Sequence, residues 1–150
     1  MSVKSQEKNM RKLADLLNRD LGYIWGENES GPNGDKKVFL NTGKAFLRAL
    51  AKDLELRDVR VTTNPGGIAI SGSCSLIGGW DANGIHIQIS QSGLGSDYDV
   101  LYRATQHSRD YTGGHNRWLT RHDLARMSYG QLLDTILALR KEAGAHERAA

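Results

Sequence analysis

Apolar side chains recur at three- and four-residue steps in three segments of the chain, a spacing that places them on one face of a helix. These predicted helices span residues 5–24, 43–56 and 129–143. Asn41 or Thr42 would cap the second helix, and Ser128 with Gln131 fits a capping box in front of the third. We therefore expect two helices near the start of the chain and one near its end.

The hydrophobic period changes from helical to alternating in the middle of the chain. The predicted strands span residues 57–63, 68–77, 85–90 and 98–105. The pair Asn83 and Gly84 is a strong hairpin signal, and the other connections are also short, so successive strands should pair antiparallel. The expected fold is α+β, with N-terminal helices, a four-stranded antiparallel meander and a C-terminal helix packed on one face of the sheet.

The 150 residues are expected to form a single domain. Its parts are an N-terminal helix (1–25), a loop (26–37), a core (38–143) and a frayed tail (144–150). No apolar run reaches the roughly 20 residues of a membrane span, and none follows the N-terminal charges, so we expect no membrane contact and no secretory signal. The single cysteine, Cys74, is expected in the core and favours a cytoplasmic protein. The sequence leaves the oligomeric state open.

Alternation divides the predicted sheet into an apolar face and a polar face. In the third predicted strand the isoleucines point one way, while His86 and Gln88 point the other. The polar face would present basic, hydroxyl and amide side chains: Arg60, Thr62, Ser71, Ser73, Ser75, His86, Gln88 and Arg103. Two interpretations are open: an ordinary solvated face, or a platform for a ligand, a nucleic acid or a protein.

The surplus positive charge is concentrated between residues 103 and 126. This segment holds five arginines against two aspartates, a formal +3, which equals the formal charge of the whole chain. No lysine occurs between Lys52 and Lys141, so the charge of the segment is carried by arginine alone. Arginine presents a planar fork of donors that fits phosphate or carboxylate, which favours shaped recognition over diffuse attraction.

The candidate binding residues come from this segment, the polar face and one turn. They are Arg103, Arg109, Tyr111, His115, Asn116, Arg117, Arg121, His86 and Trp80. Trp80 is expected to be exposed because it lies in a turn, and with Tyr111 it would supply stacking or packing area. Trp118 and Leu119 are expected to anchor the segment on the core.

The histidines of the segment match no recognised site. His107, His115 and His122 are separated by eight and then seven residues, which is not a metal-ligand spacing, so we expect neither a metal nor a cofactor. Because histidine titrates near neutrality, acid–base catalysis by His107 or His115 with Asp110 is an alternative. No nucleophile elbow, paired-carboxylate motif or Walker loop accompanies it.

Residues 84–119 contain the string LYR at the end of a predicted strand, followed by DYTGGHN. This segment resembles small uncharacterised proteins of phages and other mobile elements, which carry no assigned activity. Many such proteins inhibit host defence, as anti-CRISPR proteins do. The resemblance implies a non-enzymatic inhibitor that engages a host defence complex or nucleic acid through the arginine segment. The alternative is a small enzyme that processes nucleic acid or a nucleotide with His107, Asp110 and His115.

Overall fold

The computed structural model describes most of the chain as one sheet and a layer of helices. The described residues are 2–19, 21, 34–66, 71–92, 97–110 and 113–141. The helices are α1 (Val3–Leu17), α2 (Asp35–Asp53), α3 (Arg121–Arg126) and α4 (Tyr129–Leu137). The strands are β1 (Arg57–Asn64), β2 (Ser73–Gly79), β3 (Gly84–Ser90), β4 (Val100–Thr105) and β5 (Arg117–Leu119).

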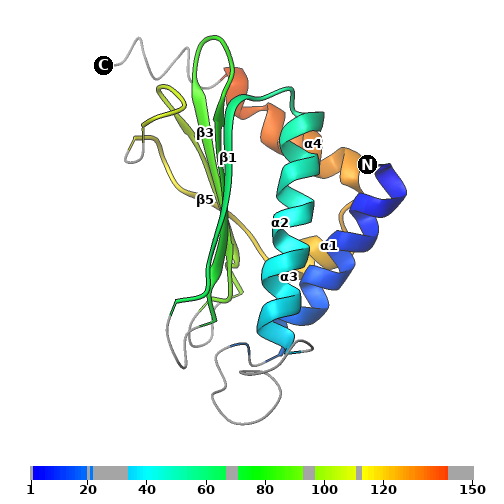
Figure 1. Ribbon diagram of the computed structural model, residues 1–150. Coiled ribbons are helices and arrows are strands. Elements are labelled where there is room, and N and C mark those ends of the chain that lie inside the picture. Colours follow the sequence, from blue (N-terminus) through cyan, green and yellow to red (C-terminus); the bar gives the residue numbers. More distant parts are fainter. Residues whose placement is uncertain are drawn as a thin grey trace.

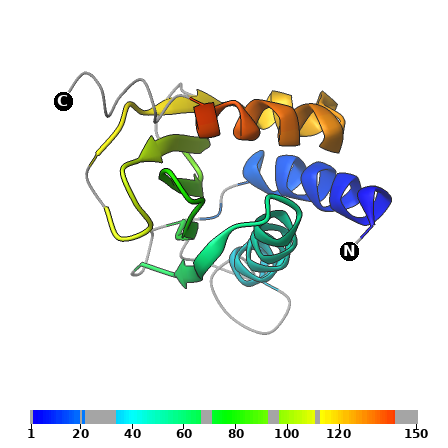
Figure 2. The ribbon, with the colours of Figure 1, turned by 90° about the horizontal axis from the view of Figure 1, so that it is seen from above.

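The strands follow one another across the sheet in chain order, and each neighbouring pair is antiparallel. The labelled helices all lie on the same side of this sheet (Figure 1). α2 contacts β1 and β2, whereas α1 contacts α2, α3 and α4. Seen from above, α1 lies between α2 and the C-terminal helices (Figure 2). We call the face of the sheet turned away from these helices the outer face.

The α+β class and the antiparallel meander are confirmed, but the predicted number of strands is wrong. β5 pairs with β4 as a fifth strand, and its three residues are too few to give a periodic signal. α3 is also absent from the predicted elements. Its start carries a local signal that could have revealed it, a capping box of Thr120 and Asp123.

α1 is shorter than predicted. It starts behind Ser2, whose hydroxyl caps it, and ends at Leu17, with Asn18 as the C-cap. The predicted end at residue 24 is therefore wrong, and the last predicted turn lies outside the described residues. Leu21 is nevertheless buried, so an apolar position beyond the helix end also packs in the core and imitates the helical spacing.

α2 is longer than predicted. It starts behind Gly34 and continues through Asn41 and Thr42, so neither of these residues caps it. The predicted loop over residues 26–37 is wrong from residue 35 onward, and residues 26–33 lie outside the described part of the chain. The apolar residues 38–40 are too few to show a helical period alone, yet they form a turn continuous with the rest of the helix.

The other boundaries differ less. β2 starts at Ser73, five residues later than predicted, and residues 67–70 are not among those described. β4 starts at Val100, two residues later than predicted. The capping box of Ser128 and Gln131 in front of α4 is confirmed. α4 ends at Leu137, with Ala138 as the C-cap, so the predicted continuation of this helix to residue 143 is wrong. The predicted stop at Gly144 and the tail lie outside the described residues.

The hydrophobic core lies between the inner face of the sheet and the helices. Ile85, Ile87 and Ile89 of β3 are at most 2% exposed, and burying each side chain stabilises the fold by about 1.5–3 kcal/mol. Cys74 is in the core as predicted, and burial raises the pKa of its thiol to about 12. Gly43 of α2 permits this packing, because a Cβ there would lie 2.4 Å from the Cys74 sulfur.

A buried ion pair joins the start of α3 to the start of β4. Arg121 donates to the Asp99 carboxylate from Nε at 2.8 Å and from Nη2 at 3.2 Å. The Asp99 side chain is fully buried, and the Arg121 side chain is 13% exposed. Asp99 also accepts the backbone N–H of Ser92 at 2.7 Å. Removing the guanidinium would leave a buried carboxylate without its cation, which is costly in a low-dielectric interior.

We predict that Arg121→Met lowers the free energy of unfolding by about 3–5 kcal/mol. Arg57→Met is the control. Arg57 pairs with Asp81, but the two side chains are 69% and 79% exposed. Its loss should therefore change the free energy of unfolding by less than about 1 kcal/mol. Urea denaturation measures both values, and equal effects would contradict the importance of burial.

Candidate functional site

The strand register aligns the outward side chains into rows that run across the outer face. The first, which we call the arginine row, consists of Arg60, Ile77, His86 and Arg103 on β1 to β4. The second consists of Thr62, Ser75, Gln88, Leu101 and Trp118 on β1 to β5. The third consists of Asn64, Ser73 and Ser90 on β1 to β3. None of the positions in these rows carries a carboxylate.

The predicted polar face is thus confirmed as a geometric feature. Along β3 the isoleucines are buried, while His86, Gln88 and Ser90 are half-buried on the opposite side. Ile77, Leu101 and Trp118 are the apolar exceptions within the rows. An ordinary solvated sheet face usually mixes lysine with glutamate, whereas these rows combine arginine, histidine, hydroxyls and amides.

His86 occupies the centre of the arginine row. It pairs with Ile77 on one side and with Arg103 on the other. Its burial, and secondly the positive charge of Arg103, lower the pKa of the imidazole below its ordinary value. Its buried Nδ1 atom has no hydrogen-bond partner among the described residues. If an anion bound over this row, the ring could take up a proton, and both of its nitrogens would then be hydrogen-bond donors.

The loop after β4 positions the two arginines of the row. The guanidinium of Arg60 donates from Nη2 to the Ser108 carbonyl at 2.6 Å. The guanidinium of Arg103 donates from Nη1 to Asn116 Oδ1 at 3.4 Å. Both contacts are made to uncharged oxygens and restrict the rotamers of these long side chains, which lowers the entropy lost when they bind an anion.

This loop lies against the end of the outer face because two glycines make room for it. Gly79 and Gly84 pair at the end of β2 and β3, two residues beyond the arginine row. A Cβ at Gly84 would lie 2.3 Å from the His107 carbonyl oxygen, and a Cβ at Gly79 would lie 3.1 Å from the Ser108 Cβ. The loop therefore forms a rim along one side of the arginine row.

Asp110 shapes this loop. Its carboxylate accepts the backbone N–H of Gln106 at 3.1 Å and that of Gly113 at 2.9 Å, one on each oxygen. His107 accepts the backbone N–H of Arg109 on Nδ1 at 3.1 Å. Asp110 and His107 therefore stabilise the backbone conformation of the loop. His115 is exposed on the segment that leads into β5.

Trp80 is buried, so the prediction of an exposed aromatic side chain there is wrong. It is 7% exposed, and its indole Nε1 donates to the Leu54 carbonyl at 2.9 Å. The guanidinium of Arg140 lies over its ring, 5.8 Å from the centroid. A turn in the backbone does not decide where the side chain points, and here distant elements enclose it.

Trp118 is the exposed aromatic residue, and its predicted role as an anchor is wrong. Trp118 is 45% exposed, and its ring stacks on that of Tyr98 with the ring centroids 6.1 Å apart and an interplanar angle of 27°. Leu119 is buried, as predicted. Alternation in β5 explains the difference, because a strand that turns Leu119 inward must turn Trp118 outward. Tyr98 was not among the predicted site residues.

The remaining candidate residues do not form one cluster. Arg109 is exposed, and its Nε lies 3.7 Å from an oxygen of Asp58. Arg117 pairs with Tyr102 and so points to the helix side of the sheet edge. Arg121 is committed to the buried ion pair, and Tyr111 is not among the described residues. Among the described residues of the predicted set, the structure places His86 and Arg103 on the outer face, with Asn116 in contact with Arg103.

Comparisons of the chain with protein-family models, with curated proteins and with solved structures gave no significant match. Within the described residues, no group of three or more histidine, cysteine, aspartate or glutamate side chains is placed to hold a metal ion. None of the helices in that part of the chain is both long and apolar enough to cross a membrane. Function must therefore be inferred from the outer face and its surroundings.

The depressed pKa of His86 predicts a pH-dependent stability. As the pH falls, the imidazole of His86 takes up a proton in the unfolded chain before it does so in the folded protein. The contribution of neutral His86 to the free energy of unfolding is therefore complete above the ordinary histidine pKa of about 6.5, and it is lost as the pH falls towards the lower pKa of the folded state. His86→Gln should flatten the dependence of the unfolding free energy on pH between about 7.5 and 5.5.

The contribution of Arg103 can be tested separately. Arg103→Gln removes the neighbouring charge and should raise the pKa of His86, measured from the ring signals by NMR. An unchanged His86 pKa in this variant would contradict the proposed electrostatic coupling along the row.

Proposed function

We propose that this protein is a non-enzymatic binding protein that holds single-stranded nucleic acid on the outer face of its sheet. The observation that carries this proposal is the arginine row, one of three rows whose positions hold no carboxylate, together with the stacked pair of Tyr98 and Trp118 beside it. Sequence-tolerant binding of single strands combines a positive surface for phosphates with aromatic rings for bases, and this face has both.

The phosphates would be bound by Arg60 and Arg103. The guanidinium group offers a planar fork that donates two parallel hydrogen bonds to phosphate. The two arginines lie on β1 and β4, three strand intervals apart, which is about 14 Å. His86 lies between them and would add a charge on protonation.

The bases would be bound at the edge formed by β4 and β5. Tyr98 is 57% exposed and Trp118 is 45% exposed, so their rings are accessible as well as mutually stacked. A base stacked on such a ring contributes about 1–3 kcal/mol. Gln88, Ser75 and Thr62, in the same row as Trp118, supply donors and acceptors along the path.

The shape and polarity of the face favour a single strand over other partners. Reading the major groove of a duplex requires a helix or a two-stranded ribbon that enters it, whereas a sheet face accommodates unstacked bases. The core of a protein–protein interface is mostly apolar, whereas hydroxyl and amide side chains occupy three of the five positions in the row that contains Trp118. That the protein is a phage or mobile-element inhibitor of host defence stays a prediction. In that role, the bound strand would be the guide or target nucleic acid of the host defence complex.

We predict that Arg103→Ala weakens binding of a labelled oligonucleotide of about ten nucleotides and lowers the slope of log affinity against log salt by about 0.7, the loss of one phosphate contact. Trp118→Ala should weaken binding about 5- to 100-fold with an unchanged salt slope, because it removes stacking and no charge. Fluorescence anisotropy at several salt concentrations measures both quantities.

Arg19→Ala is the matched control. It removes the same charge from an exposed arginine that follows α1 and pairs with Asp15 and Asp35 on the helix side. If Arg19→Ala weakens binding as much as Arg103→Ala, the attraction is diffuse and the outer face is not the site.

A further inference from the structure

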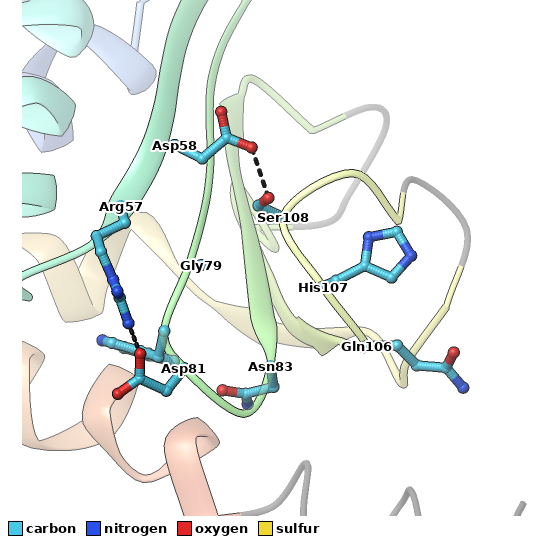
Figure 3. A pocket seen from close by; sticks show the side chains of 9 residues that line it. Arg57, Asp58, Gly79, Asp81, Asn83, Gln106, His107 and Ser108 are labelled. Atoms are coloured by element: carbon cyan, nitrogen blue, oxygen red, sulfur yellow. Dashed lines mark hydrogen bonds and ion pairs between the residues drawn. The ribbon is translucent and has the colours of Figure 1, made fainter.

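A pocket of about 360 Å³ lies at the end of the sheet (Figure 3). Residues 106–108 of the loop that follows β4 form one wall of this pocket, and β1 and the turn between β2 and β3 form the rest. Figure 3 shows Asp58 and Asn83 at opposite ends of this pocket and Arg57 and His107 on its two sides. Gly79 lies between them and presents backbone without a side chain. The volume falls within the range of pockets that bind small molecules or single nucleotide units.

Asp58 is held in an unusual conformation at the edge of this pocket. The strand register shifts between Arg57 and Arg60, and Asp58 in this bulge has a φ of 53°, in the left-handed region. Its Oδ2 atom accepts the Ser108 hydroxyl at 2.6 Å and lies 3.7 Å from the Arg109 Nε. Outliers of this kind at a pocket are a reason to suspect binding. Neither contact involves Oδ1, and a carboxylate oxygen accepts more than one hydrogen bond, so both oxygens can accept from a ligand.

Asn83 supplies a second acceptor, which is buried. The residue is 1% exposed, and its Nδ2 donates to the Leu139 carbonyl at 3.0 Å, which fixes the orientation of the amide. Its buried Oδ1 has no hydrogen-bond partner among the residues that the structure describes. A buried amide oxygen costs free energy unless it accepts a hydrogen bond, so a donor group of a ligand would be favoured there.

The charges of the residues that line the pocket disfavour a phosphate and favour a donor-bearing ligand. Asp58 and Asp81 bring two carboxylates, against the one guanidinium of Arg57, which pairs with Asp81. On the opposite side, His107 accepts on Nδ1, so its neutral form carries the proton on Nε2 and presents a donor. The pocket thus offers acceptors at its ends and donors at its sides.

We propose that this pocket binds a guanine base of the bound strand and makes the protein selective for guanine. Guanine carries two adjacent donors, N1–H and the 2-amino group, which match one carboxylate, here that of Asp58. It carries the acceptors O6 and N7 on another edge, which match the guanidinium of Arg57. Asn83, at the other end of the pocket, would accept from a hydroxyl of the sugar. This inference rests on the proposed function, because the arginine row would bring the strand to the loop that separates the two sites.

Calorimetry with neutral nucleosides tests the pocket without probing the arginine row, because nucleosides lack phosphate. Guanosine should bind at least tenfold more tightly than inosine, which lacks only the 2-amino group, and more tightly than uridine. Asp58→Asn should weaken guanosine binding at least tenfold; asparagine tolerates positive φ and keeps the bulge. His107→Ala, a change in an exposed loop, should also weaken guanosine binding. This variant replaces Asp58→Asn in the test if Asp58→Asn does not fold.

The failure of this inference can be distinguished from the failure of the proposed function. Arg103→Ala should leave guanosine affinity unchanged while it weakens oligonucleotide binding. Equal affinity for guanosine, inosine and uridine, or no effect of Asp58→Asn and His107→Ala, overturns the guanine site even if the oligonucleotide still binds. Loss of guanosine binding in Arg103→Ala also overturns it, because the site would then lie on the outer face.

Discussion

The register of the five strands keeps two opposite surfaces of the protein in place at the same time. It turns the isoleucines of β3 into the core and aligns Arg60, His86 and Arg103 on the outer face. A shift of one residue in any strand would exchange these sides. The hydrophobic effect that holds α2 on β1 and β2 therefore also fixes the arginine row, because both depend on the same hydrogen-bonded pairs.

The arginines that are close in the sequence have separate roles in space. Arg103 lies on the outer face, Arg117 points to the helix side, and Arg121 is buried against Asp99. Alternation along β4 and β5 separates the first two, and the turn into α3 removes the third. The proposed recognition surface is therefore the sheet face and not the arginine segment as a whole. On this face Arg60, from a distant strand, lies in the same row as Arg103.

The two proposed sites differ in polarity because the loop after β4 divides them. On one side of it the arginine row provides donors for phosphate, and on the other the pocket provides acceptors around Asp58 and Asn83. The glycine pair Gly79 and Gly84 lets the loop lie there. Such a division would allow phosphate and base of one strand to be recognised separately.

The sequence by itself determined the features that depend on local periodicity. The helical spacing, the alternation in β3 and the capping box at Ser128 predicted the elements and the polar face, since each depends on residues only a few positions apart. Only the tertiary structure decided that Trp80 is buried and Trp118 exposed, and that Ser108 meets Asp58 across fifty positions of the chain. Burial and pairing depend on which distant element packs against a side chain, and no local pattern records that.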